Sequence, residues 1–169
     1  MRKFIFSLLL TAFIPLFTMA QEPTKEAGMR FGGTTGFDVK FNSGDEWAFE
    51  TILGFRGRGI QVYGLMENIK PIMLERLDNL FLYYGGGGHL GFVRWSDPSH
   101  WYDDPYYDHR YDFHTGFAMG VDGIVGVEYK FHSVPLSMGV DFKPFFEIYG
   151  PFFFRVNAWD FGFNVRYVF

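Results

Sequence analysis

The chain of 169 residues contains no cysteine, so no disulfide can stabilise its fold. Beyond residue 20 it has no apolar run of the roughly 20 residues that a transmembrane helix needs. Its formal net charge is −4, and no basic patch is interleaved with aromatic residues. We therefore expect no nucleic-acid partner. Stability must come from a closed sheet, a packed core or a surrounding lipid phase.

The N-terminus has the features of a secretory signal peptide. Arg2 and Lys3 precede a nearly continuous apolar run from Phe4 to Phe17, and Ala20 is the small residue before a polar segment. A run of about 14 residues is short for a membrane anchor. We predict cleavage after Ala20, a loose N-terminal tail over 21–27, and one domain over 28–169.

Aromatic residues make up 22 % of the sequence and charged residues 20 %. The two kinds alternate along the chain, most clearly at its C-terminus. The apolar set there is Trp159, Phe161, Phe163, Val165, Tyr167 and Phe169, and Asp160, Gly162, Asn164 and Arg166 lie between its members. Such period-two alternation predicts strands with one apolar face and one polar face.

Seven segments show this alternation: 29–41, 46–56, 60–68, 79–93, 117–131, 136–147 and 159–169. Single-chain bacterial barrels have an even number of strands, with eight in the smallest. We therefore expect an eighth strand, hidden either in 69–78 or in 106–113. The segment 94–115 is rich in Asp, Tyr, His and Pro, and we predict a long loop there.

The polar faces carry charges of both signs at nearby positions: Arg30, Asp38, Lys40, Glu50, Glu128, Lys130, Asp141, Lys143 and Arg166. A soluble sandwich or lipocalin-like barrel also alternates, but its apolar face is the buried one. In lipid, every backbone group must pair, so an amphipathic sheet has to close. We predict an all-β, closed, antiparallel, up-and-down transmembrane barrel whose interior charges pair with one another.

Three stretches and the C-terminus support a more specific comparison. The stretches 83–92, 122–130 and 135–144 resemble short outer-membrane β-barrel proteins of the Bacteroidetes type, and the sequence ends in Tyr167-Val168-Phe169. The terminal residues are similar to the β-signal that the barrel assembly machinery recognises. This resemblance implies a location in the cell outer membrane of a Gram-negative cell envelope, with Phe169 on the periplasmic side. It then makes 94–115 and 148–157 external and 131–135 a periplasmic turn.

Several polar groups are candidates for chemistry. His89 is expected to be a hydrogen-bonded interior histidine, and Glu50, Glu67, Glu128 and Asp141 are expected to form salt bridges rather than acid–base pairs. A metal site could use the set Asp97, His100, Asp103, Asp104, Asp108, His109, Asp112 and His114, but its spacing matches no defined motif. His132-Ser133 has no adjacent acid. We therefore assign no catalytic, cofactor-binding or metal-binding residue.

Two classes of function stay open on the sequence. The first is a monomeric barrel of structural, adhesion or surface-interaction type, which contacts outer-membrane lipid and lipopolysaccharide and has no pore wide enough for bulk diffusion. The second is a barrel enzyme that modifies lipid or lipopolysaccharide. An enzyme should gather Ser, His and a carboxylate at one rim, and the sequence does not show such a group.

Overall fold

The computed structural model describes residues 24–44, 46–73, 79–96, 113–150 and 153–169. The predicted signal peptide and most of the predicted loop 94–115 lie outside these residues. No helix in the described part of the chain is long and apolar enough to span a membrane. The strands are β1 (Lys25–Gly32), β2 (Thr35–Asn42), β3 (Trp47–Arg56), β4 (Gly59–Pro71), β5 (Leu80–Ser96), β6 (Phe113–Lys130), β7 (Leu136–Phe142), β8 (Phe145–Tyr149), β9 (Phe153–Asn157) and β10 (Phe161–Val168).

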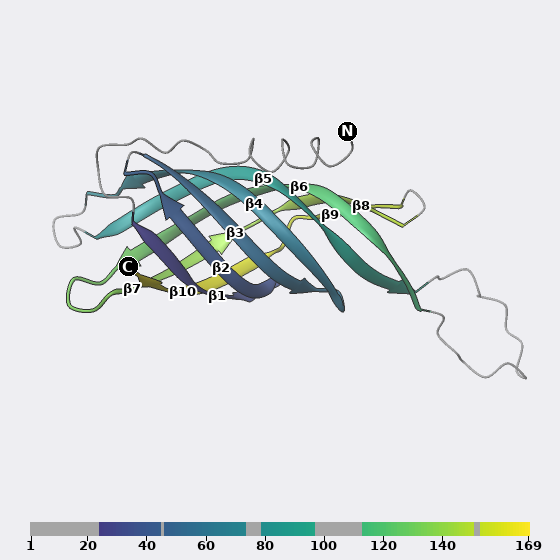
Figure 1. Ribbon diagram of the computed structural model, residues 1–169. Coiled ribbons are helices and arrows are strands. Elements are labelled where there is room, and N and C mark those ends of the chain that lie inside the picture. Colours follow the sequence, from purple (N-terminus) through teal and green to yellow (C-terminus); the bar gives the residue numbers. More distant parts are fainter. Residues whose placement is uncertain (1–23, 45, 74–78, 97–112, 151–152) are drawn as a thin grey trace, which may run out of the picture.

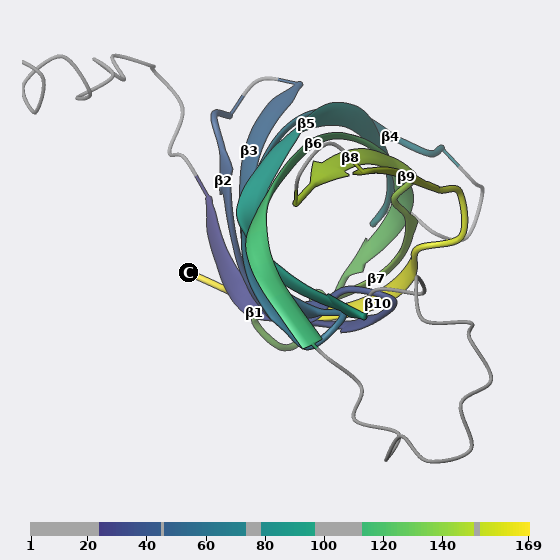
Figure 2. The ribbon, with the colours of Figure 1, turned by 90° about the vertical axis from the view of Figure 1, so that its right-hand side faces the viewer.

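The strands form one closed antiparallel barrel, seen down its axis in Figure 2. Consecutive strands pair with one another from β1 to β7, β8 pairs with β9, and β1 pairs with β10 to close the ring, with Met29 opposite Val165. Both β7 and β8 pair with β6 in one continuous register, so together they make one wall strand. In the same way, β9 continues β10, and the ten segments make eight wall strands.

The eighth strand lies where we did not expect it. Segment 29–41 holds two strands, β1 and β2, joined by a tight turn at Gly33 and Thr34. Their pairing places Arg30 opposite Gly36, six positions apart. Because this separation is even, odd-numbered residues face outward on both strands, and the alternation passes through the turn unbroken. Segment 69–78 supplies only the end of β4 and, within its described residues, no separate crossing.

Three expected boundaries also change. β1 begins at Lys25, inside the segment predicted as a tail. β5 runs to Ser96 and β6 starts at Phe113, so residues at both ends of the predicted loop 94–115 belong to strands. The predicted external loop 148–157 is largely a hairpin, since Tyr149 pairs with Phe153. In each case strand pairing with a neighbour extends the sheet beyond the clean alternation.

Two neighbouring wall strands are each interrupted once, one between β7 and β8 and the other between β9 and β10. Pro144 has no N–H and divides β7 from β8, although its carbonyl still accepts a hydrogen bond from the Gly123 N–H. Two residues separate Phe142 from Phe145, whereas three separate their partners Phe161 and Asn157. The extra residue makes a bulge at 158–160. This bulge turns Asp160 into the barrel and leaves Trp159 on the outside.

We call the end of the barrel that carries Lys25 and Phe169 the terminal end (Figure 1). The opposite, distal end carries the β3–β4 turn and the connection between β8 and β9. The β3–β4 turn has two residues, and both Gly57 and Arg58 have φ of 59°. Such left-handed turns match the twist of the flanking strands.

Candidate functional site: the charged interior and the distal end

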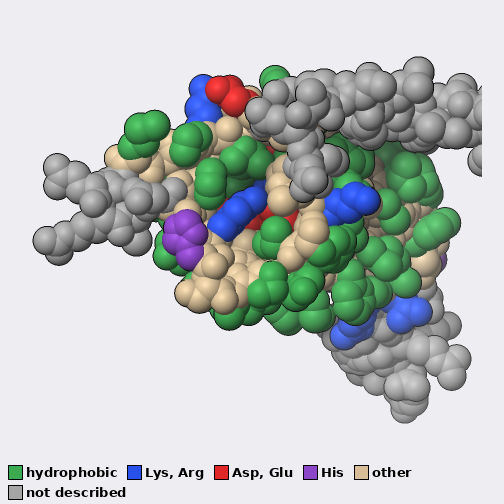
Figure 3. Space-filling view, turned by 60° about the vertical axis from the view of Figure 1, so that its left-hand side comes forward, with side chains coloured by type: hydrophobic (Ala, Val, Ile, Leu, Met, Phe, Trp, Pro, Cys, Tyr) green, Lys and Arg blue, Asp and Glu red, His purple; other side chains and the backbone are tan. Residues whose placement is uncertain are grey.

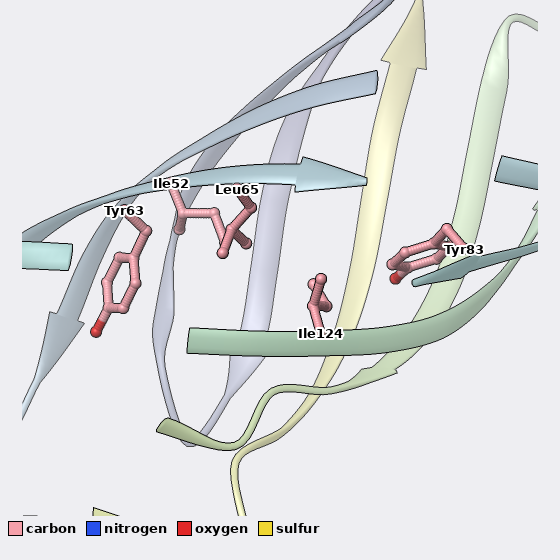
Figure 4. Packing of buried hydrophobic residues seen from close by; sticks show 5 residues of the cluster. All are labelled: Ile52, Tyr63, Leu65, Tyr83 and Ile124. Atoms are coloured by element: carbon pink, nitrogen blue, oxygen red, sulfur yellow. The ribbon is translucent and has the colours of Figure 1, made fainter. Parts of the chain in front are cut away.

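Burial in this barrel is inverted relative to a soluble protein. Among the described residues, nine hydrophobic side chains are buried, against twenty polar or charged ones. Five of the hydrophobic ones form a small interior cluster, shown in Figure 4: Ile52, Tyr63, Leu65, Tyr83 and Ile124. The outward face carries many exposed Phe, Trp, Val and Met side chains, and hydrophobic groups cover much of the view in Figure 3. Both faces match the assignment made from the alternation.

A first group of charges, the terminal cluster, fills the barrel toward the terminal end. Arg166 donates to Asp38 and Glu50 at 2.8 Å each. Lys40 lies 2.7 Å from Glu67 and 3.4 Å from Glu128. Lys130 contacts Glu26, which also accepts from Asn42. The prediction that Glu50, Glu67 and Glu128 form interior salt bridges is confirmed.

A second group of charged residues joins β1 to the last two wall strands, β7–β8 and β9–β10. Arg30 is fully buried and donates to Asp141, and its Nη1 lies 3.2 Å from Asp160. Asp160 also accepts from the backbone N–H and the hydroxyl of Thr34, at 3.0 and 2.6 Å. These contacts fasten the β1–β2 turn to β10 at the point where the ring closes. A Cβ at Gly162 would overlap the Arg30 guanidinium, so a larger residue there would displace Arg30 from these contacts.

A third group, the distal cluster, centres on Glu147. Its Oε2 accepts from Arg56 and from Gln61 at 3.1 Å, and it lies 3.2 Å from the Nε2 of His89. Its Oε1 accepts from Arg155 at 2.6 Å. The Arg56 side chain is 8 % exposed and the Arg155 side chain 41 %, so the cluster runs from the interior to the rim. Two arginines thus share one carboxylate.

His89 lies inside the barrel, as expected, and is hydrogen-bonded. Its Nδ1 lies 2.7 Å from Asp122, whose other oxygen is 3.3 Å from Lys143. Its ring also packs near Tyr63 and Phe145, with centroid distances of 5.0 and 5.8 Å. The described partners of His89 are therefore carboxylates and aromatic rings. This environment suits a structural histidine that bridges two wall strands.

The remaining sequence candidates are not brought together into a site. His132 and Ser133 are exposed in the turn between β6 and β7, beside a shallow depression that no carboxylate side chain lines. Of the acidic and histidine set in 94–115, only His114 belongs to the described residues, and it is exposed. Within the described part of the chain, no group of three or more potential ligands could hold a metal ion.

Sequence reasoning missed two members of these clusters. Glu26 was placed in the tail, and Arg155 in a loop. Glu26 lies in the first residues of β1, which are small and polar, and Arg155 lies in β9, which has only five residues, so the alternation revealed neither position. Glu147 ends the alternating segment 136–147, on the same face as Asp141 and Lys143, but its convergence with Arg56 depends on the barrel register.

No protein-family model matches the chain, and no curated protein matches it. Its fold is similar to the N-terminal β-barrel domain of OprF from Pseudomonas aeruginosa, with a TM-score of 0.57 and 12 % sequence identity. That similarity covers 89 % of this chain and 100 % of the other. The chain is therefore an eight-stranded antiparallel barrel of the outer-membrane type. At this identity the comparison extends to the fold alone.

Proposed function

We propose that the chain is a small outer-membrane protein of structural or surface-interaction type. The observation that carries the proposal is the inverted burial, with charged groups inside and large apolar groups outside. A sheet with this arrangement is stable where lipid covers the outer face and the ring closes, here between β1 and β10, although among the described strands the short β9 keeps one unpaired edge. Residues 1–20 supply the export signal in this proposal.

The proposal includes an orientation and partners. Phe169 and the turn at 131–135 face the periplasm, and the distal end faces outward. The last strand, with its outward Phe161, Phe163 and Tyr167, presents the signal to the assembly machinery. Lipid and lipopolysaccharide are the surrounding partners, and the barrel acts as a monomer. The resemblance of the C-terminal residues to the β-signal supports this picture.

The filled interior argues against a wide diffusion pore. Large side chains such as Arg30, Arg166 and Tyr83 are fully buried inside the ring. Eight strands give an interior just wide enough for such side chains. We do not propose the lipid-modifying enzyme. Among the described residues, the buried histidine is His89, and its side chain contacts two carboxylates and two aromatic rings rather than a nucleophile.

Fractionation of cells that express the full chain tests the proposal. We expect the protein in outer membranes, beginning at Gln21, with heat-modifiable migration on gels. Purified protein in planar bilayers should show no large, steady conductance. Recovery from the soluble periplasm would refute the membrane barrel, whereas a porin-like conductance would refute only the closed interior.

A further inference from the structure

The distal cluster has more donors than the structure uses. Arg56 and Arg155 both bind Glu147, yet the Nε and Nη1 of Arg56 and the Nε of Arg155 are buried with no acceptor among the described residues. The Arg56 guanidinium lies over the Phe145 ring at 3.8 Å, which orients it without satisfying its N–H groups. Unpaired buried donors on a charged group are costly. Such donors point to a missing acceptor.

The local charge has the same implication. Two guanidinium groups face the single carboxylate of Glu147, because the nearby Asp122 is engaged by Lys143 and His89. The cluster therefore has an excess of positive charge. Planar guanidinium groups bind oxyanions in bidentate fashion, and phosphate matches their geometry well.

Arg155 lies on a strand with one unpaired edge, and its side chain is 41 % exposed. Within the described strands, β9 hydrogen-bonds only to β8, so its other edge is free (Figure 2). Arg155 points inward from β9, between the outward Phe154 and Val156, which are 73 % and 67 % exposed. Phe154 stacks near Phe146 on the adjacent strand, with centroids 6.3 Å apart. A charged group and an apolar surface thus meet across one free strand edge.

We propose that Arg56 and Arg155 form a binding site for a phosphate group at the distal end of the barrel. The phosphate accepts from the Nε and Nη1 of Arg56 and the Nε of Arg155, the donors that have no acceptor among the described residues. It comes either from a lipid headgroup, whose acyl chains cover Phe154 and Val156, or from free phosphate in the medium. The site itself does not depend on the proposed cellular location, although the lipid source does.

The test uses the full mature chain folded in a detergent without phosphate. Titration calorimetry measures binding of inorganic phosphate and, separately, of a short-chain phosphatidic acid, with the matching diacylglycerol as a phosphate-free control. We expect saturable binding that Arg155→Gln weakens by about tenfold or more, the usual effect of losing one charge-assisted contact. Lys70→Gln removes the same charge from an exposed position at the terminal end and should leave binding unchanged.

Arg56→Lys is the second variant, since it keeps the charge but removes the unpaired Nε. It should also weaken binding, and gel migration of the unheated sample checks that the barrel has formed. Tighter binding of the phosphatidic acid than of phosphate by about tenfold assigns the lipid source, and equal binding assigns free phosphate. Absence of binding by both probes, or an equal loss in Lys70→Gln, would overturn the site. Neither result bears on fractionation with outer membranes.

Discussion

Reversing the charge of Lys143 should be far more damaging than reversing an exposed charge. The Lys143 ammonium is fully buried, lies 3.3 Å from Asp122 and 3.2 Å from Asp160, and sits 4.1 Å above the Tyr63 ring. In Lys143→Glu these attractions become repulsions between three carboxylates. At an effective dielectric constant of about 20, each unit-charge pair at this distance is worth roughly 5 kcal/mol before solvation is counted.

The net loss is smaller than the gross Coulomb energy, because side chains rearrange and water enters. Breaking a buried ion pair by removing one partner typically costs about 3–5 kcal/mol, and reversal should reach at least that range. Lys25→Glu is the matched control, since Lys25 begins β1 with an exposed side chain. Urea unfolding in detergent micelles, followed by tryptophan fluorescence, compares the two. Equal midpoints for both variants would refute the view that interior ion pairs stabilise this barrel.

Three further perturbations test other parts of the structure. Gly162→Ala should destabilise the barrel by about 1–3 kcal/mol in the same unfolding assay, because the new methyl group displaces Arg30. Gly123→Ala is the control and should be neutral, because its methyl group would contact Pro144 at 3.6 Å, an ordinary van der Waals distance. Phe163→Arg on the outward face should lower the yield of heat-modifiable protein in lipid vesicles, because a cation facing lipid costs up to about 2–4 kcal/mol, while Val134→Arg in the exposed turn should not. Deleting residues 98–109 should leave folding intact, because β5 and β6 already pair up to Ser96 and Phe113, and a variant that fails to assemble would show that this segment supports the wall.

The sequence alone was sufficient to identify the two faces of most strands. In the segment 60–68, alternation puts Gln61, Tyr63, Leu65 and Glu67 on one face and Val62 on the other, and the structure buries the first set and exposes Val62. This works because a residue's side depends only on its parity within a strand. The same rule explains why the β1–β2 hairpin was missed. Odd-numbered residues face outward both before and after the turn, so the alternation shows no break there.

The pairing of the charges could not be predicted in the same way. Arg30 and Asp141 are 111 positions apart and meet only because the ring closes between β1 and β10. The alternation predicts that Arg30 and Asp141 both face the barrel interior, but it does not predict their positions along the barrel axis. Those positions depend on the register of every intervening hairpin, so a shift in one turn would reassign partners throughout the interior.

Register also determines how charge is distributed along the axis. In the terminal cluster, the five carboxylates of Glu26, Asp38, Glu50, Glu67 and Glu128 face the three cations Lys40, Lys130 and Arg166. Around Glu147 the balance is reversed, because two arginines share one carboxylate. Composition reports only a net charge of −4 for the whole chain. A surplus of guanidinium groups beside a free strand edge is therefore a property of the folded ring, which is why the distal end emerges as a binding site only from the structure.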